Sequence, residues 1–203
     1  MKKLFGFLCV ITWAFCAAAN ADQLVLKPES RLLLKGDSTL HAYSSIAKKI
    51  LFSVEFEKNT LNLSDDKIKF LDVEILIEEL KSGNSHLDKN MYEALKAPDF
   101  PKIKFHLDSY QAMPAQENHG ALQLEVSGTL NIAGVKKPAT LQVLAKTKGN
   151  EIQVQGEKKL LMTDFGIQPP VFMLGALKTA DEITIEFNLI FQKQTGGNTH
   201  EIQ

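Results

Sequence analysis

Apolar residues recur at every second position through most of the chain, and this period-two pattern limits the possible folds more than any other feature. The pattern is clearest in Ile50–Phe56 and in residues 72–78, 103–107, 122–127, 141–145, 152–162 and 183–191. Successive side chains of a strand point to opposite faces, so these runs predict sheet with one buried face and one solvated face. Turn signals such as Lys148-Gly149-Asn150 and the segment 133–138 separate the runs. Many such strands predict a barrel or a sandwich, and a barrel leaves no exposed sheet edge.

Residues 85–97 depart from the period-two pattern and predict a helix. Leu87, Met91 and Leu95 lie four residues apart and form one apolar stripe. Ser85 is the predicted N-cap, and Pro98 prevents the helix from continuing. A single amphipathic helix among strands is expected to cover an open end of the barrel, so these three apolar residues are predicted to form a lid.

The first 21 residues predict a secretory signal peptide. A short cationic start, Met1-Lys2-Lys3, precedes an apolar run, and Ala19-Asn20-Ala21 provides small residues for cleavage. The sequence therefore predicts export to the periplasm and leaves secretion beyond it open. Residues 22–193 are predicted to form one barrel domain, and residues 194–203 a polar, flexible tail.

Cleavage of the signal peptide would change the composition of the chain. Cys9 and Cys16 both lie in the signal, so the mature chain would have no disulfide and no cysteine metal ligand. The formal net charge is −1, and loss of Lys2 and Lys3 would make it −3. This charge argues against a nucleic-acid partner, which would require a basic surface. A homodimer and transient contact with a membrane remain open.

Four stretches in order resemble the YceI-like family of bacterial, lipocalin-like proteins. These stretches are Gly36-Asp37-Ser38-Thr39-Leu40-His41; Leu80-Lys81-Ser82-Gly83 with residues 87–91 and 98–105 that follow it; residues 128–141; and Met162-Thr163-Asp164-Phe165-Gly166-Ile167 with residues 181–185. The resemblance implies a mainly β, lipocalin-like eight-stranded antiparallel β-barrel with one amphipathic helix insertion. It also implies a deep apolar channel that holds a polyisoprenoid or a similar long-chain lipid.

The inward-facing apolar residues are the candidate lining of such a channel. They are Phe52, Val54, Phe56, Val73, Ile75, Ile77, Ile103, Phe105, Leu124, Val126, Leu160, Met162, Phe165, Phe187 and Leu189. No acid, amide or histidine interrupts these faces, so the channel suits an alkyl or prenyl chain. The alternative is that the same residues fill the barrel as an ordinary core, because an eight-stranded barrel can do either.

The sequence favours a neutral head group, such as that of an isoprenoid quinone, over a pyrophosphate. Binders of pyrophosphate usually gather arginines or use a helix N-terminus. The chain has a single arginine, Arg31, which makes a bidentate arginine clamp implausible. Four lysines remain able to neutralise a phosphate: Lys35, Lys136, Lys137 and Lys178.

No residue pattern predicts catalysis or a metal site. The histidines have neither His-x-His nor His-x-x-x-His spacing. Ser38 and His41 lie close in sequence but lack a nucleophile elbow and a third orienting group, so they are predicted to be a hydrogen-bonded loop. The leading hypothesis is therefore a lipid-binding protein for storage or transport, with no catalytic residue, metal or cofactor other than the bound lipid. The alternatives are an enzyme acting on a barrel-bound lipid and a protein-interaction module with a filled barrel.

Overall fold

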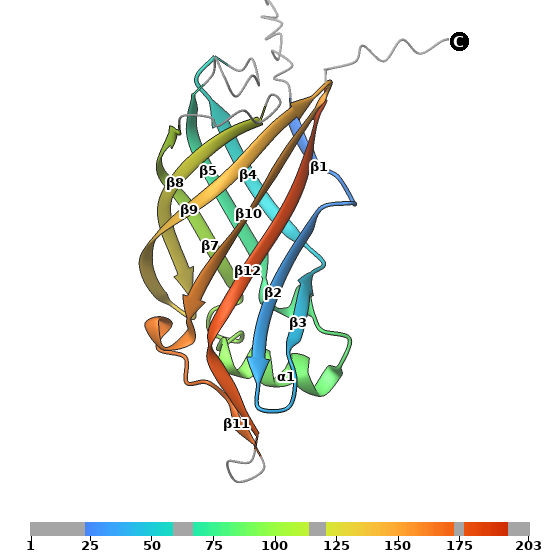
Figure 1. The fold of residues 1–203 in the computed structure, drawn as a ribbon, viewed down its shortest axis with the longest axis vertical. Helices are drawn as coiled ribbons and strands as arrows, with labels where there is room; N and C mark the ends of the chain where they lie inside the picture. Colours follow the sequence, from blue (N-terminus) through green and yellow to red (C-terminus); the bar gives the residue numbers. More distant parts are fainter. Residues whose placement is uncertain (1–22, 59–66, 114–120, 173–176, 195–203) are drawn as a thin grey trace, which may run out of the picture.

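The computed structural model describes residues 23–58, 67–113, 121–172 and 177–194. The predicted signal peptide lies outside these residues, as does the predicted tail except for Gln194. The described chain forms one curled antiparallel sheet with a helix across its lower end (Figure 1). No helix in these ranges is long and apolar enough to cross a membrane.

The strands fall into long, uninterrupted ones and short, broken ones. They are β1 (Gln23–Leu26), β2 (Arg31–Ser38), β3 (Tyr43–Ala47), β4 (Ile50–Phe56), β5 (Ile68–Leu76), β6 (Leu80–Lys81), β7 (Lys102–Ala112), β8 (Ala121–Ile132), β9 (Val135–Lys148), β10 (Glu151–Leu161), β11 (Val171–Phe172) and β12 (Leu177–Gln194). The helices are η1 (Ile77–Glu79), α1 (Ser85–Ala94) and η2 (Met162–Phe165), of which η1 and η2 are short 3-10 helices.

The strand order is β4-β5-β7-β8-β9-β10-β12-β2-β3-β6, with β1 and β11 also paired to β12. Strands β1 and β2 both pair with β12 and form one row. Strands β3 and β4 form one bent strand that pairs with β2 at one end and with β5 at the other. Together with β5, β7, β8, β9, β10 and β12 they make eight rows. The predicted lipocalin-like, eight-stranded antiparallel barrel with one helix insertion is therefore confirmed.

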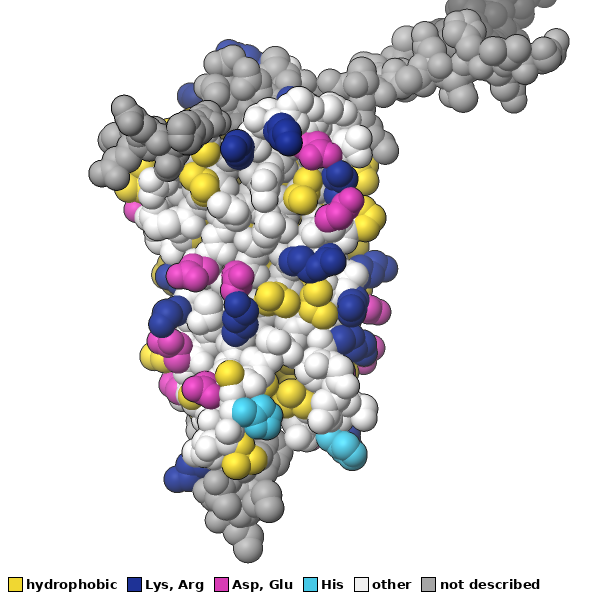
Figure 2. Space-filling view, turned by 45° about the vertical axis from the view of Figure 1, so that its right-hand side comes forward, with side chains coloured by type: hydrophobic (Ala, Val, Ile, Leu, Met, Phe, Trp, Pro, Cys, Tyr) yellow, Lys and Arg dark blue, Asp and Glu magenta, His cyan; other side chains and the backbone are white. Residues whose placement is uncertain are grey.

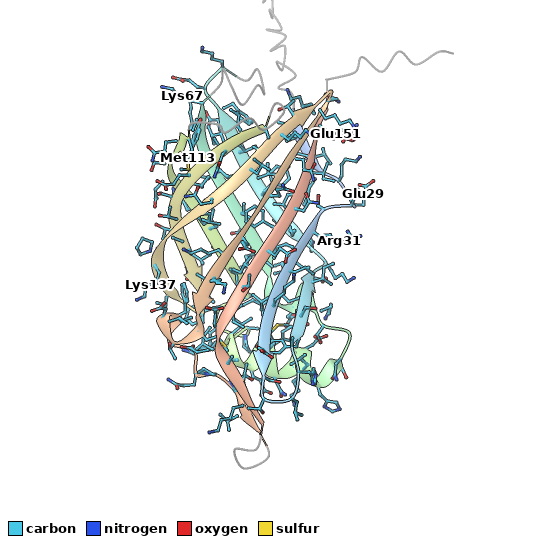
Figure 3. All side chains as sticks on the ribbon, viewed as in Figure 1. Glu29, Arg31, Lys67, Met113, Lys137 and Glu151 are labelled. Carbon is cyan, nitrogen blue, oxygen red and sulfur yellow. The ribbon has the colours of Figure 1, made fainter. Side chains whose placement is uncertain are left out.

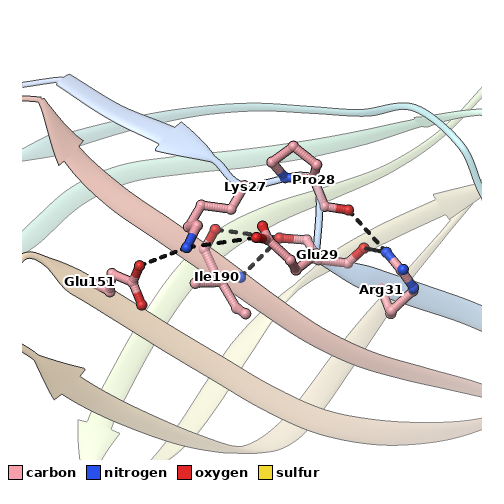
Figure 4. A network of polar contacts seen from close by, with 7 residues as sticks. Lys27, Pro28, Glu29, Arg31, Glu151 and Ile190 are labelled. Carbon is pink, nitrogen blue, oxygen red and sulfur yellow. Dashed lines mark hydrogen bonds and ion pairs between the residues drawn. The ribbon is translucent and has the colours of Figure 1, made fainter.

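The break between β1 and β2 is held against β12 by polar contacts (Figure 4). The Lys27 backbone N–H donates to the Ile190 carbonyl at 2.8 Å, and the Ser30 hydroxyl accepts from the Ile190 N–H at 2.9 Å. The Lys27 ammonium also pairs with Glu151 of β10 at 2.7 Å. Arg31 donates to the carbonyls of Pro28 and Ser30 outside the barrel, so the only arginine is used at this break.

Aromatic side chains contact each other where β4 faces β12. The ring centroids of Phe52 and Phe191 lie 4.9 Å apart in an edge-to-face arrangement. Edge-to-face aromatic pairs contribute about 0.5–1.5 kcal/mol beyond their buried area. Side-chain packing therefore joins two strands that the hydrogen-bond ladders do not connect.

The two predicted tight turns lie where the sequence places them. Gly149 adopts a φ of 59° between β9 and β10, and Gly134 a φ of 82° between β8 and β9. Ala133 precedes Gly134 with a φ of 49°, so both central residues of this turn are left-handed, as a type I′ hairpin requires.

Helix α1 is shorter than predicted and has a different cap. It ends at Ala94, and its N-cap is Asn84, whose side chain accepts from the N–H groups of His86 and Leu87. The Asp88 carboxylate accepts from the Ser82 N–H at 2.8 Å and from the Ser82 hydroxyl at 2.6 Å. The first turn of α1 is therefore fixed to the chain that leaves β6.

Charges of both signs lie outside the barrel, mixed with small apolar patches over the face shown in Figure 2. Figure 3 shows the labelled side chains of Glu29, Arg31 and Lys137 directed away from the ribbon. Cross-strand ion pairs join neighbouring strands, including Lys102 to Glu74 at 2.6 Å. The outer face is therefore the polar face that the period-two pattern predicted.

Candidate functional site

The inner faces of the strands line an apolar space, the barrel cavity, of about 210 Å³. Its wall combines inward residues of nearly every row: Leu24, Leu32, Phe52, Val54, Phe56, Ile68, Leu71, Val73, Ile75, Ile103, Phe105, Leu107, Tyr110, Leu124, Val126, Leu130, Ala139, Leu141, Val143, Ala145, Ile152, Val154, Lys158, Ile185, Phe187, Leu189 and Phe191. Lys158 is the one charged residue in this wall. The Tyr110 hydroxyl accepts a hydrogen bond from the Ile68 N–H at 3.0 Å, which satisfies the other polar side chain.

Most of the predicted channel residues lie in this wall. They are Phe52, Val54, Phe56, Val73, Ile75, Ile103, Phe105, Leu124, Val126, Phe187 and Leu189. Strand alternation brings them together, because each occupies an inward position of its strand. Their contact with a ligand remains a prediction.

Two aromatic rings of the wall lie against glycines of neighbouring strands. A Cβ atom at Gly128 would lie 2.4 Å from the Phe105 ring, and one at Gly156 would lie 2.8 Å from the Phe187 ring. Both glycines occupy inward positions, so each removes a side chain and lets a ring lie against the strand. The two rings therefore occupy less of the volume inside the barrel than they would if larger residues stood in place of the glycines.

A second, smaller space of about 100 Å³, the helix-side cavity, lies between the lower barrel and α1. The predicted lid residues Leu87, Met91 and Leu95 line it from the helix. Three predicted channel residues, Leu160, Met162 and Phe165, line this cavity and not the barrel cavity.

Strand β10 ends at Leu161, and this explains the position of Met162 and Phe165. The chain turns there into η2, which ends at the left-handed Gly166 with a φ of 66°. The Asp181 carboxylate holds the turn by accepting from the Thr163 N–H at 2.9 Å and the Thr163 hydroxyl at 2.6 Å. These hydrogen bonds keep the pKa of Asp181 below its ordinary value.

Ile77 lines neither cavity, contrary to its predicted place in the channel. Strand β5 ends at Leu76, two residues before the end of the predicted alternating run, and Ile77 begins η1. Ile77 has an exposed fraction of 0% and packs in the main core cluster with Leu80 and Leu95. It is a core residue beside the helix.

Polar side chains attach α1 to the barrel. The Tyr92 hydroxyl lies 2.8 Å from the Leu80 carbonyl and 3.0 Å from the Glu78 carbonyl, and it accepts from the Lys81 ammonium at 2.9 Å. The helix also contributes Asn90 to the wall of the helix-side cavity, opposite a barrel wall that includes Tyr43. A helix held by side-chain hydrogen bonds and apolar contacts can separate from the barrel without breaking a strand ladder.

Ile103 and Ile185 line both cavities and form the boundary between them. Ile103 has an exposed fraction of 4%, and Ile185 is half-buried. The two spaces therefore share two aliphatic side chains, and the charged Lys158 of the barrel-cavity wall pairs across the sheet with one of them, Ile185.

The loop that carries Ser38 and His41 has the hydrogen-bonding role that the sequence predicted. The Ser38 hydroxyl donates to the His41 carbonyl at 2.8 Å and accepts from the N–H groups of Leu40 and His41 at 3.3 Å. This pattern binds the hydroxyl to backbone atoms and not to an imidazole. Among the described residues, no group of three or more His, Cys, Asp or Glu side chains is placed to hold a metal ion.

Comparison with known proteins identifies relatives of the same architecture. The chain is similar to the crystal structure of BcnA of Burkholderia cenocepacia, with 16% identity, a TM-score of 0.64, and coverage of 82% of this chain and 99% of that chain. A polyisoprenoid-binding domain from Saccharophagus degradans, implicated in plant cell wall breakdown, matches with 13% identity, a TM-score of 0.64, and coverage of 84% and 98%. The YceI protein of Campylobacter jejuni matches with 19% identity, a TM-score of 0.55, and coverage of 73% and 82%.

The sequence comparisons give a family assignment. No curated protein matches the chain. The family description "YceI-like domain" matches residues 38–191, which include every strand of the barrel from β3 to β11 and most of β12. The chain belongs to the YceI-like domain family.

Proposed function

We propose that the chain binds one long-chain lipid of the isoprenoid class in the barrel cavity, for storage or transport, and that it does so after export to the periplasm. The observation that carries this proposal is the cavity wall, in which Lys158 is the only charged side chain. A wall of this kind offers few hydrogen bonds to a polar ligand, whereas a prenyl chain needs none. The relative from Saccharophagus degradans, described as polyisoprenoid-binding, supports the ligand class.

The free energy of burial favours a tail in this space. Each buried CH₂ group contributes about 0.8 kcal/mol, so several prenyl units exceed the cost of ordering the chain. In water between two membranes, an isolated prenyl chain would otherwise aggregate or enter a bilayer.

The size of the cavities limits the ligand. The barrel cavity of about 210 Å³ and the helix-side cavity of about 100 Å³ together approach the lower end of the usual range for ligand pockets, about 300–1,000 Å³. A short prenyl chain fits the barrel cavity, whereas a longer chain requires the side chains at the Ile103–Ile185 boundary to move. The proposal therefore includes a ligand that extends from one cavity into the other.

Mass spectrometry of lipids released from natively purified, exported protein tests the proposal. We expect an isoprenoid lipid in a ratio near one per chain. Purified protein that contains no lipid and fails to bind added prenyl alcohols would disprove it, and would favour a filled barrel that binds a protein partner.

Binding without catalysis is part of the proposal. The Ser38 hydroxyl is committed to backbone atoms of its own loop, and the wall of the barrel cavity contains no histidine, carboxylate or thiol. Turnover of a bound prenyl lipid that His41→Ala abolishes, while binding remains, would replace this view with an enzymatic one.

A further inference from the structure

Lys158 occupies an inward position of β10, in a barrel that is otherwise apolar inside. The inward residues of this strand are Ile152, Val154, Gly156, Lys158 and Leu160, and Lys158 pairs across the sheet with Ile185 of β12. A lysine on an inner face has a cost, because an ammonium group in an apolar space loses its hydration. The Lys158 ammonium therefore needs either a partner of opposite charge or contact with water.

Lys158 has no partner among the residues that the structure describes. None of the hydrogen bonds or ion pairs of the described residues involves the Lys158 ammonium, whereas its outward neighbour Lys159 pairs with Glu182 at 2.9 Å. Lys158 is half-buried, so part of its side chain remains accessible. Long lysine side chains commonly line an apolar surface with the stem and direct the charge toward water.

The backbone beside Lys158 provides such a route. The ladder between β9 and β10 runs from the pair Lys148–Glu151 to the pair Gln142–Glu157 and ends there. Below it, β9 pairs only with β8 and β10 pairs only with β12, and Figure 1 shows this part of β9 curving away from β10. We call this region the ladder gap. Lys158 is the first inward residue of β10 in the gap.

The barrel cavity reaches the ladder gap from inside. Ala139 and Leu141 of β9 and Lys158 of β10 border the gap, and all three line the barrel cavity. Below them, η2 contacts both strands, and its Phe165 is buried with an exposed fraction of 3%. The gap is therefore closed beneath by η2 and bounded above by the last ladder pair.

We propose that Lys158 binds the anionic head group, a phosphate or a carboxylate, of a lipid whose tail fills the barrel cavity. A head group in the ladder gap keeps its charge hydrated from outside and forms a charge-assisted hydrogen bond with the ammonium. This inference rests on the proposed lipid binding. It replaces the neutral head group that the single arginine suggested, because one inward lysine supplies the positive charge that Arg31 does not.

The acidic residues nearby limit how far the head group extends. Glu157 and Glu186 are cross-strand partners on the outer face, next to the gap, and Glu186 also pairs with Lys35. An anion that passed beyond the ammonium would approach the negative charges of Glu157 and Glu186. The site therefore suits a small anionic group such as a monophosphate or a carboxylate.

The test compares two probes that share one tail, geranylgeranyl monophosphate and geranylgeraniol, by displacement of a fluorescent apolar probe. We expect the wild-type chain to bind the phosphate roughly 10- to 100-fold more tightly than the alcohol, the range for a hydrogen bond between charged groups. Lys158→Met, which keeps the apolar stem, should lose this preference and retain the affinity for the alcohol. Lys159→Met, on the outer face of the same strand, is the matched control and should keep the preference.

Each outcome separates the two proposals. A preference for the phosphate that survives in Lys158→Met overturns the head-group site and leaves lipid binding intact. A wild-type chain that binds neither probe overturns the proposed function itself. A third outcome is that inorganic phosphate alone displaces the phosphate lipid from the wild-type chain but not from Lys158→Met. That result supports the anion site at Lys158 and shows that the site also binds free phosphate.

Discussion

The barrel cavity and the helix-side cavity use the inner face of the same sheet, yet different elements complete them. Among the described residues, only strand residues line the barrel cavity, and its Phe105 and Phe187 rings lie against glycines. The helix-side cavity is completed by α1 and η2, which add Met91, Leu95 and Phe165 to its lining. The first space is the larger, at about 210 Å³ against about 100 Å³.

The difference shows how one sheet can hold a space at one end and close at the other. Hydrogen-bond ladders fix the strands and keep the wall of the barrel cavity in place. Side-chain contacts hold the helix, and such contacts break at a smaller cost than a ladder does. We therefore expect the barrel cavity to determine what binds and the helix-side cavity to determine how fast the ligand exchanges.

Truncation at the boundary between the cavities should have the largest effect. Ile103→Ala removes a residue with an exposed fraction of 4% that lines both cavities, and should lower the free energy of unfolding by about 2–5 kcal/mol. By joining the two spaces it should also shift binding toward longer prenyl chains. Urea unfolding and affinities for prenyl alcohols of increasing length measure the two effects.

Ile77→Ala is the matched control for this change. Ile77 is fully buried but lines neither cavity, so a similar loss of stability should leave the chain-length preference as it is. If both variants shifted the preference equally, the effect would come from lost stability and not from the boundary.

Filling the barrel cavity should affect binding more than stability. Val126→Trp places a large side chain in its wall and should weaken binding of a prenyl alcohol roughly tenfold or more, with about 1–3 kcal/mol lost from overpacking. Ala94→Trp fills the helix-side cavity and should preserve binding of short chains. Equal loss in the two variants would contradict the distinction between the cavities.

Loosening α1 should change exchange rates with a small change in stability. Tyr92→Phe removes the hydroxyl that bonds to the Leu80 and Glu78 carbonyls, at a cost of about 1 kcal/mol. Release of bound lipid to acceptor vesicles should become faster, and a cross-link between α1 and β6 should slow it. Lys89→Ala, on the exposed side of α1, serves as control. If neither the substitution nor the cross-link changed the rate of lipid release, α1 would have no role in lipid exchange.

The smallest expected effect concerns Tyr43, whose side chain lines the helix-side cavity. Burial, and then the nearby negative charge of Asp37, raise the pKa of the Tyr43 hydroxyl above its ordinary 10.0. The folded state holds this proton more tightly than the unfolded state, so the stabilisation is complete below pH 10.0 and is lost as the pH rises through the folded pKa. Ultraviolet titration of the wild type against Tyr43→Phe measures it. A difference curve with its midpoint at or below 10.0 would contradict the assignment.

Alternation and turn residues predicted the strands and hairpins but left a barrel or a sandwich open, and the resemblance to the YceI-like family implied the eight-stranded barrel. The period-two runs mark the inner face of each long strand, and the glycines at 134 and 149 mark the hairpins. These are local signals, so they can be read from neighbouring residues alone. The wall of the barrel cavity follows from them, which is why most predicted channel residues lie in it.

The errors arise where the chain leaves a strand. Ile77 and Met162 continue the alternating pattern in sequence, but the 3-10 helices η1 and η2 begin at these residues, and Phe165 lies within η2. The end of β10 depends on Asp181, which is distant in sequence from the turn it holds. Such contacts carry no local signal.

Lys158 was overlooked for a different reason. The alternation of β10 places it inward, between Gly156 and Leu160, so the signal was available in the sequence. The lysines predicted as able to neutralise a phosphate, Lys35, Lys136, Lys137 and Lys178, are exposed, whereas Lys158 is half-buried on the inner face. A charged residue at an inward position of a strand is therefore a candidate functional residue, as a buried polar group is.

Strand β12 pairs with β1, β2, β10 and β11, and these contacts set the order in which the molecule can assemble. Its pairing with the start of the chain spans large separations, such as the 160 residues between Ser30 and Ile190. A nascent chain can form the β7–β10 meander early, but the apolar inner face of this meander stays exposed to water until β12 pairs with it. A chain cut before β12 would therefore be an aggregation-prone open sheet, not a smaller version of the molecule.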